Sequence, residues 1–180
     1  RHSQNCELYS FCNINILSTL DLSNLTKLET LDCTSNQITN INLFNTPKLS
    51  NLNCSKNKLT DLDLNYSPSL TILNCSINKL SSLDFTKSNK IENINCAQNN
   101  LTSLITLEDK LTLSTLNCSF NQIDNLDVSK TINLANLNCS NNLITSLNTS
   151  NLINISILKC QFNKIPNLDL SKSSKLFTLY

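Results

Sequence analysis

The sequence predicts a repeat solenoid: a right-handed coil of about eight 21-residue repeats with two stacked parallel β-sheets and little or no helix. Three observations lead to this prediction. Eight cysteines recur at a fixed spacing, an asparagine follows each of them by three residues, and aliphatic residues recur at fixed distances on both sides. Self-similarity at such a period is typical of a stack in which each repeat forms one coil.

The cysteine spacing is 21 residues throughout, except for 22 residues between Cys96 and Cys118. The repeated cysteines, each of which names its coil below, are Cys12, Cys33, Cys54, Cys75, Cys96, Cys118, Cys139 and Cys160. We expect all eight to be reduced, buried thiols that pack as small apolar groups. Neighbouring parallel strands hold their Cβ vectors side by side, which is poor geometry for a disulfide. Cys6 lies outside the spacing and could pair with Cys12 or with a partner chain.

Alternation of apolar and polar residues predicts two short strands in each coil. Leu31-Asp32-Cys33 has the period of a half-buried strand, and Leu62-Asp63-Leu64 has the same period in the second half of its coil. In-register stacking pairs each strand with its copy in the next coil, about 4.8 Å away. The apolar positions of both strands then point inward, and no coil can bury them alone.

The recurring asparagine is interpreted as structural. An amide carries two donors and an acceptor, so an inward stack can satisfy backbone groups that a tight corner would leave unpaired. The predicted structural ladder comprises Asn36, Asn57, Asn78, Asn99, Asn121, Asn142 and Asn163, and Asn15 precedes it. Because the chain has no glycine, we also expect asparagine at corners that require a positive φ.

The written pattern is LxxLxCxxNxLxxLDL, as in Leu49 to Leu64, and it resembles the 21-residue class of leucine-rich repeats over about residues 7 to 180. The resemblance implies a scaffold for protein interaction or ligand recognition, of a class found mostly in bacterial surface and secreted proteins. Two departures stand out. The asparagine that often closes the repeat is replaced, for example by Thr46 and Ser67, so the second corner must be built differently. The coil of Cys96 carries the extra residue and reads Leu104-Ile105-Thr106 where LDL is expected.

We expect one domain over residues 1–180, with 1–9 as an N-terminal cap and 10–180 as repeats. The next cysteine would fall one residue after Tyr180, so the last coil is expected to be incomplete. Residue 1 is arginine, which either a removed signal peptide or a fragment would explain.

Composition limits the partners. The net charge is +1, only 15% of residues are charged, and no basic stripe is interleaved with aromatic residues, so we expect no nucleic acid partner. No apolar run is long enough for membrane insertion. The lack of glycine excludes phosphate-binding loops. The remaining partners are a protein or glycan ligand, or copies of the chain itself, at an extracellular or cell-surface location.

The position before each cysteine is expected to point outward from the first strand and to form the interaction face. Its residues are Asp32, Asn53, Asn74, Asn95, Asn117, Asn138 and Lys159. The middle of this row is all amide and lacks the Trp, Tyr and Arg that dominate protein hot spots. A glycan or a self-associating partner suits such a surface; alternatively, the asparagines only stabilise the sheet.

A second outward column contains five aspartates: Asp21, Asp63, Asp84, Asp127 and Asp169. Stacked carboxylates could coordinate calcium. The spacing lacks a dense loop of oxygen ligands, so capping of nearby backbone N–H groups is the favoured interpretation.

We predict no catalytic residues, no cofactor and no metal site. The only histidine is His2, so no Ser-His-Asp or Cys-His arrangement can be assembled. The predicted function is a non-enzymatic recognition or adhesion scaffold. The alternative is a subunit that assembles head to tail into filaments, through Tyr180 at one end and Tyr9 and Phe11 at the other, because open strand edges can pair with another chain.

Overall fold

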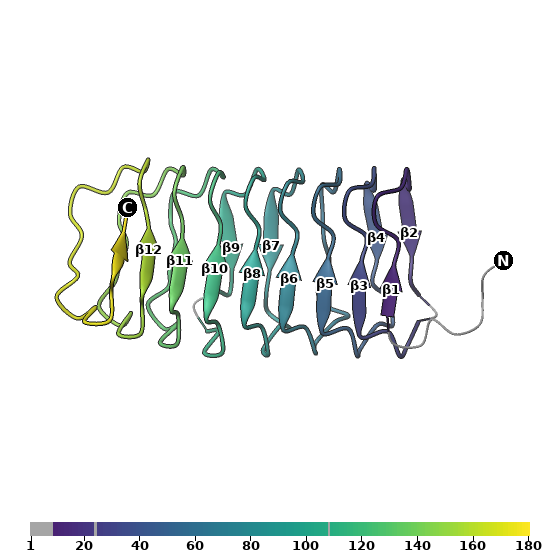
Figure 1. Ribbon diagram of the computed structural model, residues 1–180, viewed down its shortest axis with the longest axis horizontal. Coiled ribbons are helices and arrows are strands. Elements are labelled where there is room, and N and C mark those ends of the chain that lie inside the picture. Colours follow the sequence, from purple (N-terminus) through teal and green to yellow (C-terminus); the bar gives the residue numbers. More distant parts are fainter. Residues whose placement is uncertain (1–8, 24, 108) are drawn as a thin grey trace.

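The computed structural model describes residues 9–23, 25–107 and 109–180, with the backbone alone for residues 9–11. Over these residues the chain is an elongated solenoid of short parallel strands without helix, and its first and last coils lie at opposite ends (Figure 1). The predicted fold class is therefore confirmed.

One sheet runs the whole length of the solenoid and faces the viewer in Figure 1. In spatial order its strands are β1 (Tyr9–Phe11), β3 (Thr30–Asp32), β5 (Asn51–Asn53), β6 (Ile72–Asn74), β8 (Asn93–Asn95), β10 (Thr115–Asn117), β11 (Asn136–Asn138), β12 (Ile157–Lys159) and β13 (Thr178–Leu179). All pairs are parallel, and equivalent residues of neighbouring coils lie opposite each other, as Leu52 and Leu73 do.

Inward residues of this sheet build the core. The central residue of each complete strand from β3 to β12 is buried, while its two neighbours are mostly half-buried. The cysteine after each strand continues the inward line, and the seven repeated cysteines from Cys33 to Cys160 are free thiols. Six of the eight repeated cysteines are buried as predicted, whereas Cys12 and Cys160, in the first and last of these coils, are only half-buried. The predicted alternation thus places leucine and cysteine side by side in one continuous apolar column.

The second sheet is less regular than the predicted one. Strand β2 (Thr19–Asp21) pairs with β4 (Asn40–Asn42), and β7 (Ser82–Asp84) pairs with β9 (Ser103–Ile105). In the other described coils this side keeps no ladder pairing.

From Asn36 onward, each asparagine three residues after a cysteine joins two coils, whereas, among the described residues, the Asn15 Nδ2 bonds only carbonyls of its own coil. The Asn57 Nδ2 donates to the carbonyls of Cys54, in its own coil, and of Cys33, in the preceding one, at 3.1 and 3.0 Å. The Asn57 Oδ1 accepts from the Ile38 N–H at 3.0 Å. The same bonds recur at Asn36, Asn78, Asn99, Asn121, Asn142 and Asn163. These amides therefore satisfy corner backbone groups that water cannot reach.

The corner before each of these asparagines has a left-handed backbone. The residue two positions after every repeated cysteine has φ between 53° and 58°. The occupants are Ile14, Ser35, Lys56, Ile77, Gln98, Phe120, Asn141 and Phe162. The expectation of asparagine at such corners is therefore wrong for seven of the eight. Backbone hydrogen bonds to the neighbouring coil hold this conformation against its steric cost. The Ile77 N–H, for example, donates to the Ala97 carbonyl at 2.9 Å.

We expect Ile77→Asn to raise the free energy of unfolding by about 1 kcal/mol, because a left-handed backbone costs a β-branched residue more than it costs asparagine. Ile77 is 40% exposed, so little apolar burial is lost. Urea denaturation measures the change. The reverse substitution, Asn141→Ile at the equivalent corner, should lower the free energy of unfolding by a similar amount. If both variants are as stable as the parent, the left-handed backbone does not cost isoleucine more than asparagine.

The second corner consists of two consecutive four-residue turns, each closed by a hydrogen bond between residues three apart. The Thr46 N–H donates to the Leu43 carbonyl, and the Leu49 N–H then donates to the Thr46 carbonyl, at 3.2 and 3.1 Å. The Thr46 hydroxyl also donates to the Leu43 carbonyl at 2.7 Å. A fully buried hydroxyl residue thus stands where the repeat often has asparagine, which confirms that this corner is built differently.

The extra residue of the Cys96 coil forms a bulge at Thr106, whose φ is 54°. After it, Leu107 is buried in the place that Phe85 holds one coil earlier, since each accepts the equivalent turn bond, from Lys110 and Ser88. Lys110 thereby enters the inner column and is only 3% exposed. Its Nζ donates to the Asn89 Oδ1 at 2.9 Å, which satisfies the charged end of a side chain whose stem is buried.

Candidate interaction face

The residues of the predicted interaction face form one row on the outer side of the large sheet. In the strand register, Asp32 lies opposite Asn53 and the row continues coil by coil to Asn138 and Lys159. We call its uncharged centre, Asn53, Asn74, Asn95, Asn117 and Asn138, the amide row. All five side chains are half-buried.

Every amide in this row is turned the same way. The Asn74 Oδ1 accepts from the backbone N–H of Ser76 at 3.2 Å and from its hydroxyl at 2.8 Å. The equivalent pairs of bonds link Asn53 with Ser55, Asn117 with Ser119 and Asn138 with Ser140, whereas Asn95 accepts only from the Ala97 N–H. The acceptor of each amide is thus used by its own coil, and the Nδ2 donor remains for the outer side.

A shallow depression of about 310 Å³ lies in the middle of this face, over β6, β8 and β10. Its lining includes Asn74, Asn95 and Asn117 of the amide row, together with Ile72, Asn93 and Thr115. The sequence analysis missed the last three, which stand two positions before the row. The sequence could have predicted these three residues, because residues two apart in a strand share a face.

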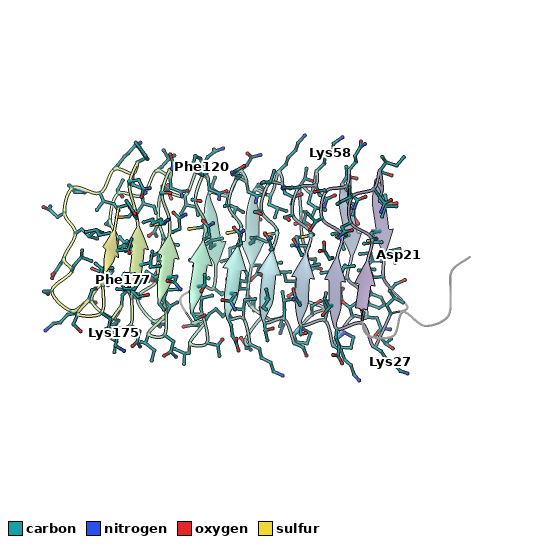
Figure 2. All side chains as sticks on the ribbon, in the orientation of Figure 1. Asp21, Lys27, Lys58, Phe120, Lys175 and Phe177 are labelled. Atoms are coloured by element: carbon teal, nitrogen blue, oxygen red, sulfur yellow. The ribbon has the colours of Figure 1, made fainter. Side chains whose placement is uncertain are left out.

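The ends of the row carry opposite charges, Asp32 at one end and Lys159 at the other. The Lys159 Nζ lies 5.3 Å from the centre of the Tyr180 ring, within range of a cation–π interaction. Lys58 and Phe120 mark one edge of the solenoid in Figure 2, and Lys27 and Lys175 mark the opposite edge. Lysine is therefore spread over both edges rather than gathered on the face.

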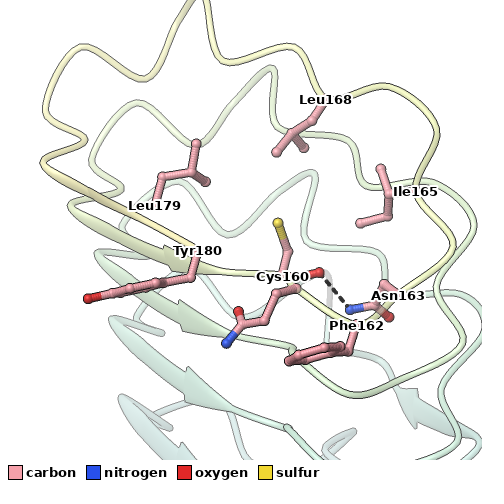
Figure 3. A pocket seen from close by; sticks show the side chains of 8 residues that line it. Cys160, Phe162, Asn163, Ile165, Leu168, Leu179 and Tyr180 are labelled. Carbon is pink, nitrogen blue, oxygen red and sulfur yellow. Dashed lines mark hydrogen bonds between the residues drawn. The ribbon is translucent and has the colours of Figure 1, made fainter.

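The residues predicted for end-to-end contacts lie at the two ends of the stack. Tyr180 is 62% exposed, and the side chains of Tyr9 and Phe11 lie outside the described residues. A second depression, of about 340 Å³, opens at the C-terminal end, lined by Cys160, Phe162, Ile165, Leu168, Leu179 and Tyr180 among others (Figure 3). The Asn163 Nδ2 bonds the Cys160 carbonyl at its rim at 2.9 Å. The lining of this depression is therefore mostly apolar.

The aspartate column caps turns. Oδ1 of Asp84 accepts from the Thr86 hydroxyl at 2.6 Å and from the Thr86 N–H at 2.8 Å, and these hydrogen bonds lower the pKa of Asp84. Asp127 makes the equivalent backbone bond with Ser129, and hydrogen bonds with Ser129 lower its pKa too. The capping interpretation is confirmed. In the part of the chain that the structure describes, no group of three or more His, Cys, Asp or Glu side chains is arranged to hold a metal ion.

The buried cysteine thiols are unreactive at neutral pH. Burial raises the pKa of Cys33 and of Cys96 to about 12, and it raises the pKa of Cys54, Cys75 and Cys118 well above the ordinary value. A thiol with such a pKa is protonated and is neither a nucleophile nor a metal ligand. His2 and Cys6 lie outside the described residues.

Solved structures of other proteins share this architecture. The functional domain of InlJ from Listeria monocytogenes, described as including a cysteine ladder, is 33% identical, covers 95% of this chain and 43% of its own, and superimposes with a TM-score of 0.74. A leucine-rich repeat protein of Leptospira interrogans is 23% identical over 88% of this chain and 44% of its own, with a TM-score of 0.81. This chain is a leucine-rich repeat protein.

The leucine-rich repeat fold is also shared with TLR13, solved in complex with ssRNA13, at 24% identity over 91% of this chain and 27% of that one, with a TM-score of 0.73. The present chain thus spans less than half the length of each of these three proteins. No protein-family model matches it, and no curated protein does. Among the described residues, none belongs to a helix long and apolar enough to cross a membrane.

Proposed function

We propose that this leucine-rich repeat protein is a non-enzymatic recognition module, and that it binds its ligand through the outer face of the large sheet. The amide row carries the proposal. Five identical side chains stand in register with their acceptors engaged and their donors turned outward, on a sheet whose inward side is rigidly packed. Binding sites are most precise when regular elements hold the contacting groups.

The test is a binding array that carries purified extracellular proteins and glycans, probed with the labelled chain. A Thr115→Arg variant would place a long charged side chain in the central depression, and it should lose the ligands that the parent retains. The exposed position Thr102, outside the large sheet, gives the matched control Thr102→Arg, which should bind as the parent does. Equal loss in both variants, or none in either, would contradict recognition through this face.

We further propose that the module works outside the cell, at a cell surface, where recognition would serve adhesion. The resemblance of its repeat to the 21-residue class, which is found mostly in bacterial surface and secreted proteins, motivates this location. Antibody labelling of intact cells against permeabilised cells tests it, and labelling that requires permeabilisation would contradict it.

Nucleic acid is not the ligand that we propose, although TLR13 is known in complex with an ssRNA. The central face has no charged side chain between Asp32 and Lys159, and phosphate recognition depends on Lys and Arg. Single-stranded RNA should therefore show no saturable binding at physiological salt, and binding that Thr115→Arg alters would contradict the choice of ligand.

A second candidate is head-to-tail assembly through the apolar depression that Leu168, Leu179 and Tyr180 line. Phe162 and Tyr180 are 76% and 62% exposed beside this depression, and stacking of another copy would cover them. Sedimentation velocity over a range of concentrations distinguishes the candidates. Growth in mass that Leu168→Asp abolishes would support assembly, and a strict monomer at high concentration would remove it.

A further inference from the structure

The orientation of the amide row restricts the chemistry of its ligand. A backbone N–H can only donate, so the group that faces the Ser76 or Ala97 N–H must be the amide oxygen. Each Nδ2 is consequently turned outward. None of the five donates to another residue in the ranges that the structure describes.

The neighbouring row adds two further amides, those of Asn93 and Asn136. The Oδ1 of each lies 3.4 Å from the hydroxyl of Ser114 or Ser156, but that hydroxyl donates its one proton to a nearer backbone carbonyl, that of Glu92 at 3.1 Å or Ala135 at 2.9 Å. The donor bias therefore belongs to the amide row, which needs a ligand that supplies oxygen acceptors.

The spacing of the donors restricts the shape of the ligand. One amide stands in each coil, so the donors repeat at about 4.8 Å along the solenoid axis. An extended polypeptide laid along that axis returns to the same side only every two residues, at about 6.7 Å, and falls out of step. A second copy of this face would set donors against donors. A linear polysaccharide suits better, because a β-1,4-linked chain presents the same side again after two hexose units, and two units are similar in length to two coils.

The depression at the centre adds an apolar element. Ile72 is 40% exposed at its rim, beside Asn74, Asn93 and Asn95. An acetamido group combines a carbonyl acceptor with a methyl group, which matches a donor amide next to an exposed isoleucine. We propose that the amide row binds a linear polysaccharide of N-acetylated hexosamine units lying along the solenoid axis. This inference rests on the proposed function, because it specifies the ligand of the same face.

The experiment compares three hexamers by titration calorimetry: β-1,4-linked N-acetylglucosamine, its fully deacetylated form and a uronic acid oligomer. The acetylated hexamer should bind at least about tenfold more tightly than the deacetylated one, which offers ammonium donors instead of carbonyl acceptors. The uronic acid arm distinguishes carboxylate from acetamide oxygens. Tighter binding of the uronic acid hexamer, or equal binding of the acetylated and deacetylated hexamers, would overturn the proposal.

The chain itself supplies conservative variants. Asp32 occupies the same column and accepts the Thr34 N–H at 2.9 Å, so Asn95→Asp and Asn117→Asp should fold with the corner bond intact while they lose the outward donor. Each should weaken binding of the acetylated hexamer about fivefold, and the double variant about 25-fold. Asn148→Asp is the matched control, because Asn148 makes the same bonds with Ser150 on the opposite side. It should bind as the parent does.

The outcomes separate this inference from the proposed function. If no acetylated hexamer binds but a protein on the array does, and Thr115→Arg abolishes that binding, the polysaccharide inference fails while recognition through the face stands. If the acetylated hexamer binds and Asn95→Asp and Asn148→Asp weaken it equally, the amide row is not the site and the inference fails. A preserved melting temperature shows in each case that the variant is folded.

Discussion

Raising the pH from about 8 to about 10 should lower the free energy of unfolding of this protein by about 8 kcal/mol. Six thiols carry this effect: Cys33, Cys54, Cys75, Cys96, Cys118 and Cys139, whose pKa burial raises from an ordinary value near 9. At pH 10 the native state keeps these protons and the unfolded chain releases them. The native state then binds more protons than the unfolded state, so stability is fully present below pH 8 and falls as pH rises.

Each thiol contributes about 1.4 kcal/mol at pH 10, and six of them approach the whole stability of an ordinary domain. Urea denaturation in the presence of reductant, followed by circular dichroism at several pH values, measures the loss. We expect the urea concentration at the midpoint of unfolding to fall steeply above pH 9. If that midpoint is unchanged up to pH 10, the buried thiols do not stay protonated in the native state as proposed.

Single replacements provide the control. Cys96→Ala lowers stability at every pH, because it leaves a small void in the core. It should also reduce the pH-dependent loss between pH 8 and 10 by about 1.4 kcal/mol, since one ionising group is gone. Cys160→Ala should change the pH dependence less, because Cys160 is only partly buried and its pKa is raised less. If the free energy of unfolding falls equally for Cys96→Ala and for the parent between pH 8 and 10, groups other than Cys96 cause the loss.

The sequence predicted the parts of the fold that repeat. The positions of Leu73, Cys75 and Asn78 recur at fixed distances in every coil, with Ser10 and Ile94 as the only departures at the leucine position, and a stack leaves one environment for each such position. Their burial and bonding depend on the neighbouring copies of the same motif. The same periodicity placed the residues of the predicted interaction face on the outer side of the large sheet, because a residue between two inward positions of a strand must point outward.

The features that sequence reasoning missed depend on bonds between coils. Ile77 and Phe120 tolerate a left-handed backbone because ladder bonds on both sides hold the corner, and local preference alone favours asparagine there. After the bulge at Thr106 the chain is back in register at Leu107, and Lys110 is buried. No local sequence pattern predicts this burial. The orientation of the amide row likewise follows from the Ser76-type bonds, which only the folded corner creates.

The asparagine ladder is the second feature whose removal should have a large effect. We expect Asn99→Leu to lower the free energy of unfolding by about 3 to 5 kcal/mol. The Asn99 Nδ2 bonds the carbonyls of Cys75 and Cys96, both at 3.1 Å, and its Oδ1 accepts the Leu80 N–H at 3.0 Å. Leucine is similar in size but leaves these buried backbone groups unpaired, at about 1 to 3 kcal/mol for each group.

Hydrogen exchange locates the damage as well as its size. Because the bonds of Asn99 join the coils of Cys75 and Cys96, the Leu80 amide should lose its protection first, and the opening should spread to both coils before the ends of the stack respond. Asn100→Leu is the matched control: Asn100 is exposed, and its own N–H already bonds the Leu80 carbonyl through the backbone. That variant should change stability by less than about 0.5 kcal/mol. Equal stability of the two variants would mean that water replaces the Asn99 amide at the corner, and that the ladder is not what holds successive coils together.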